Sequence, residues 1–234
     1  MAIAFNAESH GETNTATTSL SHTPAGSDRV MIVATVGRNA YASSCVFNTS
    51  ESLTTLYSYD NGIYYMRFFG LAAPTATTAN VVTTWGQNIG NYQSATVVTF
   101  TGVEQGTYLD ATGTAGNSGT GFNMSISMST TSDQCWVVST GNGPSGISML
   151  GTSFTAIWQA ATSNNVGGYG GPNSVGGGTV TYQGSNGVPK VGASIAIVPV
   201  ATSFIKTVDG LAKASVKTVD GLAIASVKTI NGLA

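Results

Sequence analysis

From its first residues to about residue 201, the chain alternates short apolar stretches, each the length of a β-strand, with clusters of turn-forming residues. No window of helical length carries apolar residues at the three- and four-residue spacing of an amphipathic helix. The turn clusters include PAGSD at 24–28, GNSGTG at 116–121 and GNGPSG at 141–146. About ten to twelve short strands separated by such turn clusters predict an all-β fold, an antiparallel, jelly-roll-like β-sandwich of two sheets.

Two kinds of strand are expected. Residues 29–37 (RVMIVATVG) are almost continuously apolar, as in a strand that is buried on both faces. Residues 122–129 instead alternate Phe, Met, Ile and Met with Asn and Ser, which predicts a half-buried strand. Three further stretches share the character of 29–37 and are core candidates: Thr96–Phe100, Cys135–Ser139 and Ser194–Val200.

The aromatic residues suggest a contact surface. Residues 60–62 (Asp-Asn-Gly) separate two aromatic-rich runs within 53–69, which predicts a β-hairpin whose tyrosines are exposed. Residues 166–178 are so rich in glycine that we expect a mobile loop, either a binding loop or a plain connector. The candidate contacts with a ligand or partner are Tyr57, Tyr59, Tyr64, Tyr65 and Tyr169.

The end of the chain is an 11-residue repeat, KTVDGLAKASV, KTVDGLAIASV and KTINGLA, beginning at residue 206. Asp-Gly or Asn-Gly recurs at 209, 220 and 231, and these dipeptides suit two-residue hairpin turns. Three short units cannot close a core alone, so a β-repeat tail at 202–234, after a sandwich domain at 1–201, predicts docking or oligomerisation. The apolar residues expected to mediate this assembly are Val208, Leu211, Val216, Val219, Leu222, Ile224, Val227 and Ile230.

Charge and composition exclude several classes of function. Only 8% of residues are charged, and the net charge of −2 provides no basic surface for nucleic acid. No stretch reaches the roughly 18 apolar residues of a membrane span. The first residues lack the basic region of a signal peptide, so release by host lysis inside a virus particle is one expected route out of the cell. Cys45 and Cys135 lie in strand-like runs, where buried thiols and a disulfide between neighbouring strands are both open.

No catalytic motif stands out, and we expect that the chain is not an enzyme. Both histidines, His10 and His22, lie in the first 22 residues, and His22 is expected to be a strand-end or turn residue rather than a catalytic base; no nucleophile motif accompanies them. No metal-binding spacing and no phosphate-binding loop are found, so no cofactor is expected. A glycosidase needs only two carboxylates, and that alternative stays open for Glu51, Asp60, Glu104, Asp110 and Asp133.

Four segments carry a resemblance to a known group: MAIAFNA at the start, SHTPAGSDRVMIVATVG, TGVEQGTYLD and SIAIVPV. Together they resemble a diffuse group of β-sandwich proteins from phage genomes and environmental bacterial sequences. The KTVDGLA-type tail is similar to short repeats that end many phage-associated proteins. Neither likeness includes a catalytic motif. The resemblance implies a role on the virion surface, as capsid decoration, head fibre or a tail-associated part.

The sequence therefore favours a bacteriophage structural protein, most simply a capsid decoration (cement) or head-fibre protein. Its expected partners are other copies of itself, in a homotrimer, and virion proteins such as the major capsid protein. The alternative is a carbohydrate-binding or adhesive sandwich that contacts host-surface glycan, as a receptor-binding fibre or an extracellular filament does. The expected location is the virion, assembled in the host cytoplasm, or otherwise the extracellular space.

Overall fold

The structure is a computed structural model. It describes residues 2–86, 93–117, 123–143, 148–150, 154–159, 165–176, 179–183 and 190–200, together with four two-residue strands further on. The chain divides into two compact units, residues 1–200 and 201–234. Every regular element described is a β-strand, and all described strand pairs are antiparallel, so the predicted all-β sandwich class is confirmed.

The first half of unit 1 is a β-sandwich of two sheets. Its first inner sheet has five strands, in the order β1 (Ala4–Thr13), β9 (Gln93–Thr101), β3 (Val30–Arg38), β7 (Tyr64–Ala72) and β6 (Thr54–Asp60). Its first outer sheet has four, in the order β2 (Thr17–His22), β8 (Ala79–Trp85), β4 (Ala42–Phe47) and β5 (Glu51–Ser52). Only Leu53 separates β5 from β6, so one extended segment starts in the outer sheet and continues in the inner one.

The second half is a sandwich of the same kind. Its second inner sheet runs β10 (Leu109–Asn117), β17 (Lys190–Ile197), β12 (Cys135–Asn142), β15 (Asn165–Asn173) and β14 (Phe154–Gln159). Its second outer sheet runs β11 (Asn123–Ser127), β16 (Thr179–Gln183) and β13 (Ser148–Leu150). In both halves the first strand pairs with the last strand, and the last strand also pairs with the third. This strand order is that of a jelly roll.

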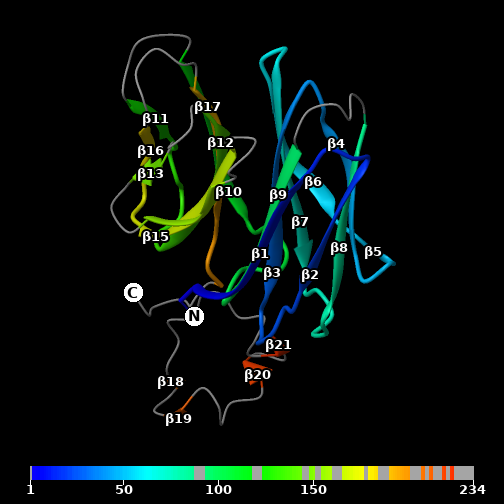
Figure 1. The fold of residues 1–234 in the computed structure, drawn as a ribbon. Helices are drawn as coiled ribbons and strands as arrows, with labels where there is room; N and C mark the ends of the chain where they lie inside the picture. The colour runs from blue at the N-terminus through cyan, green and yellow to red at the C-terminus, as the bar shows by residue number, and fades with distance from the viewer. Residues whose placement is uncertain are drawn as a thin grey trace. The chain divides into compact units, whose positions relative to one another are not determined.

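The two halves have the same strand order throughout. When β10 is matched with β1 and the later strands follow in turn, β10-β17-β12-β15-β14 reproduces β1-β9-β3-β7-β6, and β11-β16-β13 reproduces β2-β8-β4. The blue-to-cyan half and the green-to-yellow half lie side by side in Figure 1. Unit 1 is therefore a tandem pair of sandwiches with one topology, where the sequence predicted a single two-sheet sandwich.

Irregularities in the strands also match between the halves. The opening strand carries a β-bulge at Asn6 in β1 and at Asp110 in β10. In each case the bulge side chain accepts a hydrogen bond from a backbone amide in the loop before the central strand: Ala25 N is 2.9 Å from Asn6 Oδ1, and Thr131 N is 2.8 Å from Asp110 Oδ2. A second bulge occurs in both β6 and β14. β-Bulges are conserved features of a fold rather than defects. Their recurrence at matching positions therefore supports a common origin of the two halves.

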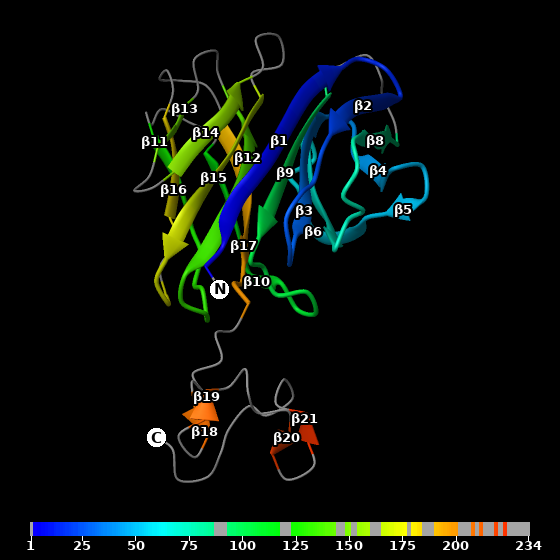
Figure 2. The ribbon, with the colours of Figure 1, turned by 90° about the horizontal axis from the view of Figure 1, so that it is seen from below.

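The four sheets of unit 1 stack as successive layers (Figure 2), and the buried apolar residues form three cores between them. The central core lies between the inner sheets and includes Ile32, Phe68 and Phe100 from one and Val138 and Ile195 from the other. Two further cores separate each inner sheet from its own outer sheet. In the central layer β3 lies against β12, β7 against β17 and β9 against β15, as expected for halves related by a twofold rotation.

This layering explains the two strand types. An inner sheet has a core on each face, and accordingly every residue of β3 from Val30 to Gly37 is buried, as predicted. An outer sheet has one core, and in β11 Met124 and Ile126 are buried while Ser125 and Ser127 are exposed. The predicted hairpin is also present, since β6 pairs with β7 around Asn61 and Gly62, where Gly62 has φ of 84°.

The prediction of a mobile loop at 166–178 is wrong. Most of this segment is β15, which pairs with β12 and β14 inside the second inner sheet. Its glycines serve close packing: a methyl group on Gly167 would collide with the Thr96 side chain, and one on Gly171 would collide with the Trp136 ring. A glycine-rich run is typical of a flexible connector, but here glycine lets neighbouring layers and neighbouring side chains approach the strand closely.

The tail contains two short hairpins. β18 (Thr207–Val208) pairs with β19 (Leu211–Ala212), and β20 (Thr218–Val219) pairs with β21 (Leu222–Ala223). In each hairpin an Asp-Gly dipeptide is all that separates the paired strands. The third expected turn, at Asn231 and Gly232, lies outside the described residues.

Replacement of Gly167 tests the strand assignment. We expect Gly167→Ala to lower the free energy of unfolding by about 1–3 kcal/mol, because the added methyl overpacks the buried Thr96. Gly106→Ala is the matched control, since its nearest neighbour to the new methyl is a flexible carboxylate oxygen 3.7 Å away. Urea unfolding measures both. Equal stability of the two variants would restore the loop interpretation.

Candidate functional site

Four of the five candidate tyrosines lie on the β6–β7 hairpin, but not on one face. Tyr57 and Tyr59 of β6 and Tyr64 of β7 are partly buried and pack against the central core. Tyr65 points to the opposite face of the sheet, since it pairs with Asp60 while Tyr59 pairs with Met66. The hairpin therefore divides the tyrosines between two environments.

On that opposite face, Tyr65 belongs to a small aromatic and cationic cluster. Its ring centroid lies 6.2 Å from that of Tyr41. The Arg67 guanidinium lies over the Tyr41 ring, 4.7 Å from its centroid, and donates a hydrogen bond of 2.8 Å to the carbonyl of Ala42. All three side chains are partly exposed, so the cluster combines an aromatic surface with a positive charge.

Tyr169 lies far from the hairpin tyrosines in sequence and has a different setting. It stacks on Phe5 with 4.7 Å between centroids and on Trp136 with 5.9 Å. Phe5 is 37% exposed, so the outer end of this stack reaches the surface. The stack joins β1 of the first sandwich to β15 and β12 of the second, which makes Tyr169 part of the junction between the sandwiches.

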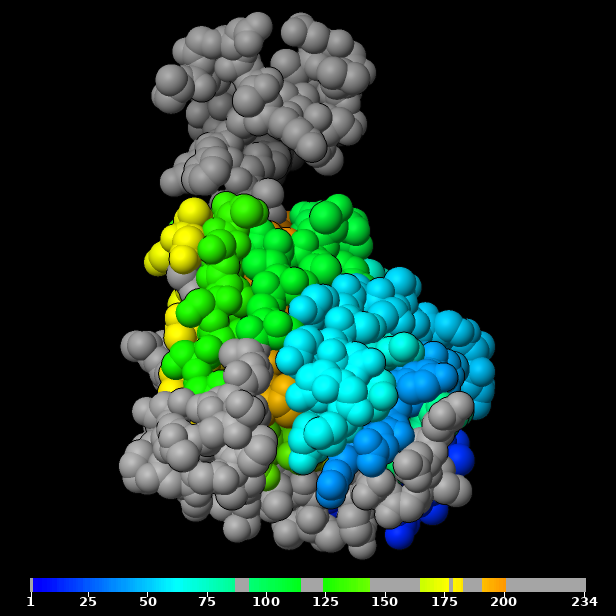
Figure 3. Space-filling model, turned by 90° about the horizontal axis from the view of Figure 1, so that it is seen from above, coloured from blue at the N-terminus to red at the C-terminus, as the bar shows by residue number. Residues whose placement is uncertain are grey.

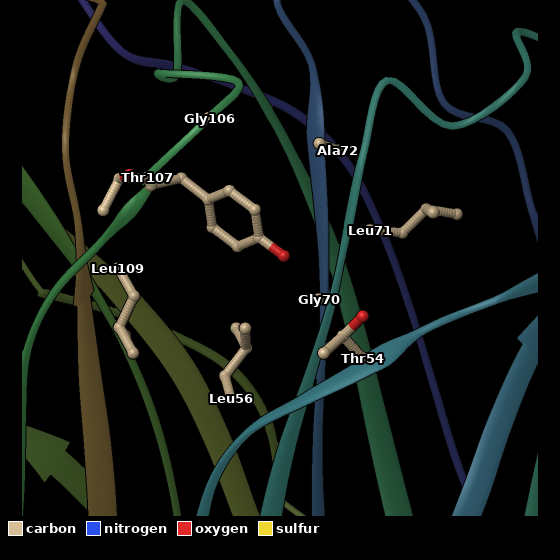
Figure 4. A pocket seen from close by; sticks show the side chains of 9 residues that line it. Thr54, Leu56, Gly70, Leu71, Ala72, Gly106, Thr107 and Leu109 are labelled. Atoms are coloured by element: carbon tan, nitrogen blue, oxygen red, sulfur yellow. The ribbon is translucent and has the colours of Figure 1, made fainter.

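A groove of about 520 Å³ opens at another part of this junction. Thr54 and Leu56 of β6, residues 70–72 of β7 and residues 106–109 line it. Figure 4 shows the labelled lining residues around the groove, and the Tyr108 hydroxyl lies against Gly70 of β7, where an added methyl group would collide with it. In Figure 3 the cyan atoms of the first sandwich border the green atoms of the second. No sequence motif indicates this groove, because its lining comes from three separate segments.

The groove has few polar groups and no charged side chain. Burial raises the pKa of Tyr108, so its hydroxyl stays protonated at neutral pH. Among the described residues this hydroxyl has no hydrogen-bond partner, and it remains able to donate to a bound group. The groove can therefore hold apolar side chains, and the Tyr108 hydroxyl can orient one hydrogen-bond acceptor among them.

The corresponding place in the other half has a different side chain. Leu109 directly precedes the bulge of β10, as Phe5 precedes the bulge of β1. At the first position the ring of Phe5 stacks on Tyr169, whereas at the second Leu109 lines the open groove. The groove is thus one of the points at which the two halves differ.

His22 has a structural environment. Its Nε2 lies 2.7 Å from Thr99 Oγ1, and its Nδ1 lies 3.0 Å from Ser9 Oγ. The Ser9 hydroxyl donates to the carbonyl of Ser21, so it is oriented as an acceptor toward the ring. Burial lowers the pKa of His22 to about 4. A neutral imidazole held on both sides stabilises the first sandwich.

The carboxylates considered for glycoside hydrolysis have local partners. Glu51 accepts from Thr75 N at 3.0 Å, Asp60 from Gly62 N at 2.6 Å and Glu104 from Gly106 N at 3.4 Å. Burial alone would raise the pKa of Asp110, but hydrogen bonds from Thr131, Cys135 and Ser132 lower it below its usual value. These four act as acceptors in turns and bulges, and Asp133 lies in the loop before β12.

Both cysteines are free and buried, in different cores. Cys45 packs between the first inner and outer sheets, and Cys135 packs between the second inner and outer sheets. Burial raises the pKa of Cys45 to about 11 and that of Cys135 to about 12. Of the two readings left open, buried thiols are what the structure contains, and a disulfide within the chain is not formed.

Within the described ranges, no cluster of three or more histidine, cysteine, aspartate or glutamate side chains is placed to hold a metal ion. The same part of the chain contains no helix long and apolar enough to cross a membrane.

Of the apolar tail residues proposed for assembly, Val208, Leu211, Val219 and Leu222 lie in the two hairpins. The other four, Val216, Ile224, Val227 and Ile230, lie outside the described residues. Hairpins of this length are at best marginally stable by themselves in water.

The fold defines a tandem jelly-roll β-sandwich protein that ends in a hairpin repeat, with an aromatic cluster and an apolar groove as candidate contact sites. No family model, curated protein or solved structure matches this chain.

The environment of His22 predicts a pH-dependent stability. The unfolded chain takes up a proton near pH 6.5 and the folded chain only near pH 4, so stability is complete above about 6.5 and falls as the pH drops toward 4. The expected loss is roughly 3 kcal/mol.

Urea unfolding of the parent and of His22→Gln between pH 7.5 and 4 measures this effect. The stability difference between them should shift in favour of the variant as the pH falls, while His10→Gln, at an exposed position, should keep the parent's dependence. Parallel losses in parent and His22→Gln would refute a neutral, buried His22.

Proposed function

We propose that this chain is a bacteriophage virion protein, a capsid decoration or head-fibre protein in which tandem sandwiches form the body and the repeat tail assembles or anchors copies. The observation that carries the proposal is the contrast between the two units. Residues 1–200 enclose three cores of their own, whereas the described part of the tail is two hairpins with two-residue strands, which are marginally stable by themselves. A chain built in this way is completed by assembly, and a homotrimer bound to the major capsid protein fits that requirement.

The surface chemistry supports a particle-bound role. Ser, Thr and Gly occupy 89 of 234 positions, and only 8% of residues are charged. On the first outer sheet, Thr17, Ser19 and Ser21 are exposed, and on the second Ser125, Ser127 and Thr179 are exposed. A surface that is polar through hydroxyl groups responds weakly to changes in ionic strength, because salt screens charges. This property suits a protein released into varied surroundings by host lysis.

Truncation tests the proposal. The full chain and a chain ending at Thr202 are compared by light scattering after size exclusion. We expect a trimer or another closed oligomer for the full chain and a folded monomer for the truncated one, because the body has complete cores without the tail. A monomeric full chain that also fails to bind phage capsids would contradict the proposal.

Glycan binding is a second candidate, and the cluster of Tyr41, Tyr65 and Arg67 favours it. Aromatic rings stack on the apolar faces of sugars, and a guanidinium binds carboxylate groups of acidic sugars. A fibre on a virion and a receptor-binding surface are compatible in one chain.

A glycan array with the parent and Tyr65→Ala checks this candidate. We expect the parent to bind an acidic glycan and the variant to lose at least tenfold in affinity, because one wall of the cluster is removed. Tyr64→Ala is the matched control on the other face of the same strand. An array without any hit for the parent would exclude glycan binding as a main function.

A further inference from the structure

The groove around Tyr108 and the repeat tail each contain apolar residues that a contact between them would bury. One is an open, mostly apolar groove of unit 1, and the other contains two short hairpins whose strands include valine, leucine and alanine. We propose that a hairpin of the repeat tail from a second copy of the chain docks in the groove. This inference rests on the proposed assembly function and names the surface through which assembly occurs.

The groove offers the right chemistry for such a hairpin. Leu56, Ala72 and Leu109 supply apolar walls, and Gly70 provides space beside the Tyr108 ring. Thr54 and Thr107 are exposed lining residues. The Tyr108 hydroxyl, without a partner among the described residues, can donate to a carbonyl of an incoming strand.

The tail offers a repeated apolar pair. Val208 pairs with Leu211 in the first hairpin, and Val219 pairs with Leu222 in the second. Directly paired residues project from the same face of a two-stranded ribbon. Each hairpin therefore pairs one valine with one leucine, and the second hairpin repeats the pairing of the first.

The charges of the two units are also complementary. Residues 1–200 carry eight acidic and four basic side chains, a formal charge of −4. Residues 201–234 carry four lysines and two aspartates, a formal side-chain charge of +2. Opposite charges favour the encounter of a tail with the body of another copy, although the apolar groove itself provides the contact.

A tail-to-groove contact is heterologous, because two different surfaces meet. Such a contact produces a closed ring when the copies are related by a rotation axis. The end of unit 1 lies beside the groove's lining segment, since Val198 N donates to Tyr108 O at 2.9 Å and Val200 N donates to Gly102 O at 2.8 Å. With the origin of the tail and the groove at one end of the body, a few copies around an axis at that end can exchange tails.

The test places charge and bulk in the groove of the full chain. Thr54→Arg/Thr107→Arg keeps the fold, because both side chains are exposed, but blocks the groove and repels the basic tail. Thr17→Arg/Ser19→Arg adds the same charge at exposed positions of the first outer sheet and is the matched control. Light scattering after size exclusion, across a dilution series, gives the oligomeric state, and thermal unfolding confirms that each variant is folded.

We expect the groove variant to be monomeric, or to dissociate at concentrations at least tenfold higher than the parent, and the control to assemble like the parent. A folded groove variant that assembles like the parent would overturn the docking inference but leave the assembly function intact, since the tails would then join each other. If the parent itself is monomeric at all concentrations, the docking inference fails, whereas the proposed function fails only if the parent also does not bind phage capsids.

A mixing experiment separates exchange between copies from docking within one chain. A tagged chain of residues 1–200, which has its own complete cores, is mixed with the untagged full chain. Docking in a second copy predicts that the tagged body captures the full chain and that the groove variant of the body does not. Failure of the unmodified body to capture it, while the groove variant still alters the full chain, would assign the groove to the tail of the same chain and overturn the inference.

Discussion

The packing of the two inner sheets against each other is the interaction on which the rest of unit 1 depends. β3 and β12 each lie at the centre of a sheet, and each has an apolar core on both faces. An isolated sandwich would expose the face that carries Ile32, Phe68 and Phe100, and the loss of that burial would remove a large part of the hydrophobic driving force. The second sandwich thus completes a core that the first cannot enclose alone. The groove and the aromatic stack both occur where this central layer reaches the surface.

Much of the fold could be predicted from local patterns. The doubly apolar run at 29–37, the alternation at 122–129 and the Asp-Asn-Gly turn each encode a feature that depends only on neighbouring residues. The duplication could not be predicted, because the corresponding strands share patterns of burial but few identical residues. A faint signal exists where Phe5-Asn6-Ala7 parallels Leu109-Asp110-Ala111, but three residues do not reveal a repeat without the strand order.

The candidate sites were harder to predict than the fold. Tyrosine suggested exposure, but Tyr57, Tyr59 and Tyr64 lie partly buried against the central core, because a wide aromatic ring at the edge of a sheet covers apolar neighbours. Glycine suggested flexibility, but in β15 it permits contact between layers. The groove depends on three segments that only the tertiary fold brings together, so no pattern within one segment could indicate it. The tail hairpins were easier to predict from the sequence, since they depend on local turn chemistry alone.

The tandem arrangement also has a consequence for how the chain folds during synthesis. The strands of the first sandwich are complete once residue 101 has left the ribosome, but the face of its inner sheet that carries Ile32 and Phe100 stays uncovered until β12 and β17 have formed. A nascent chain therefore passes through an intermediate that exposes a broad apolar sheet, and chains crowded on one messenger RNA could pair through it. The Phe5 ring, synthesised first, reaches its partners Trp136 and Tyr169 only after most of the chain exists. The beginning of the polypeptide is thus held by β9 within the first sandwich, but its Phe5 ring gains its stacking partner only with the second sandwich.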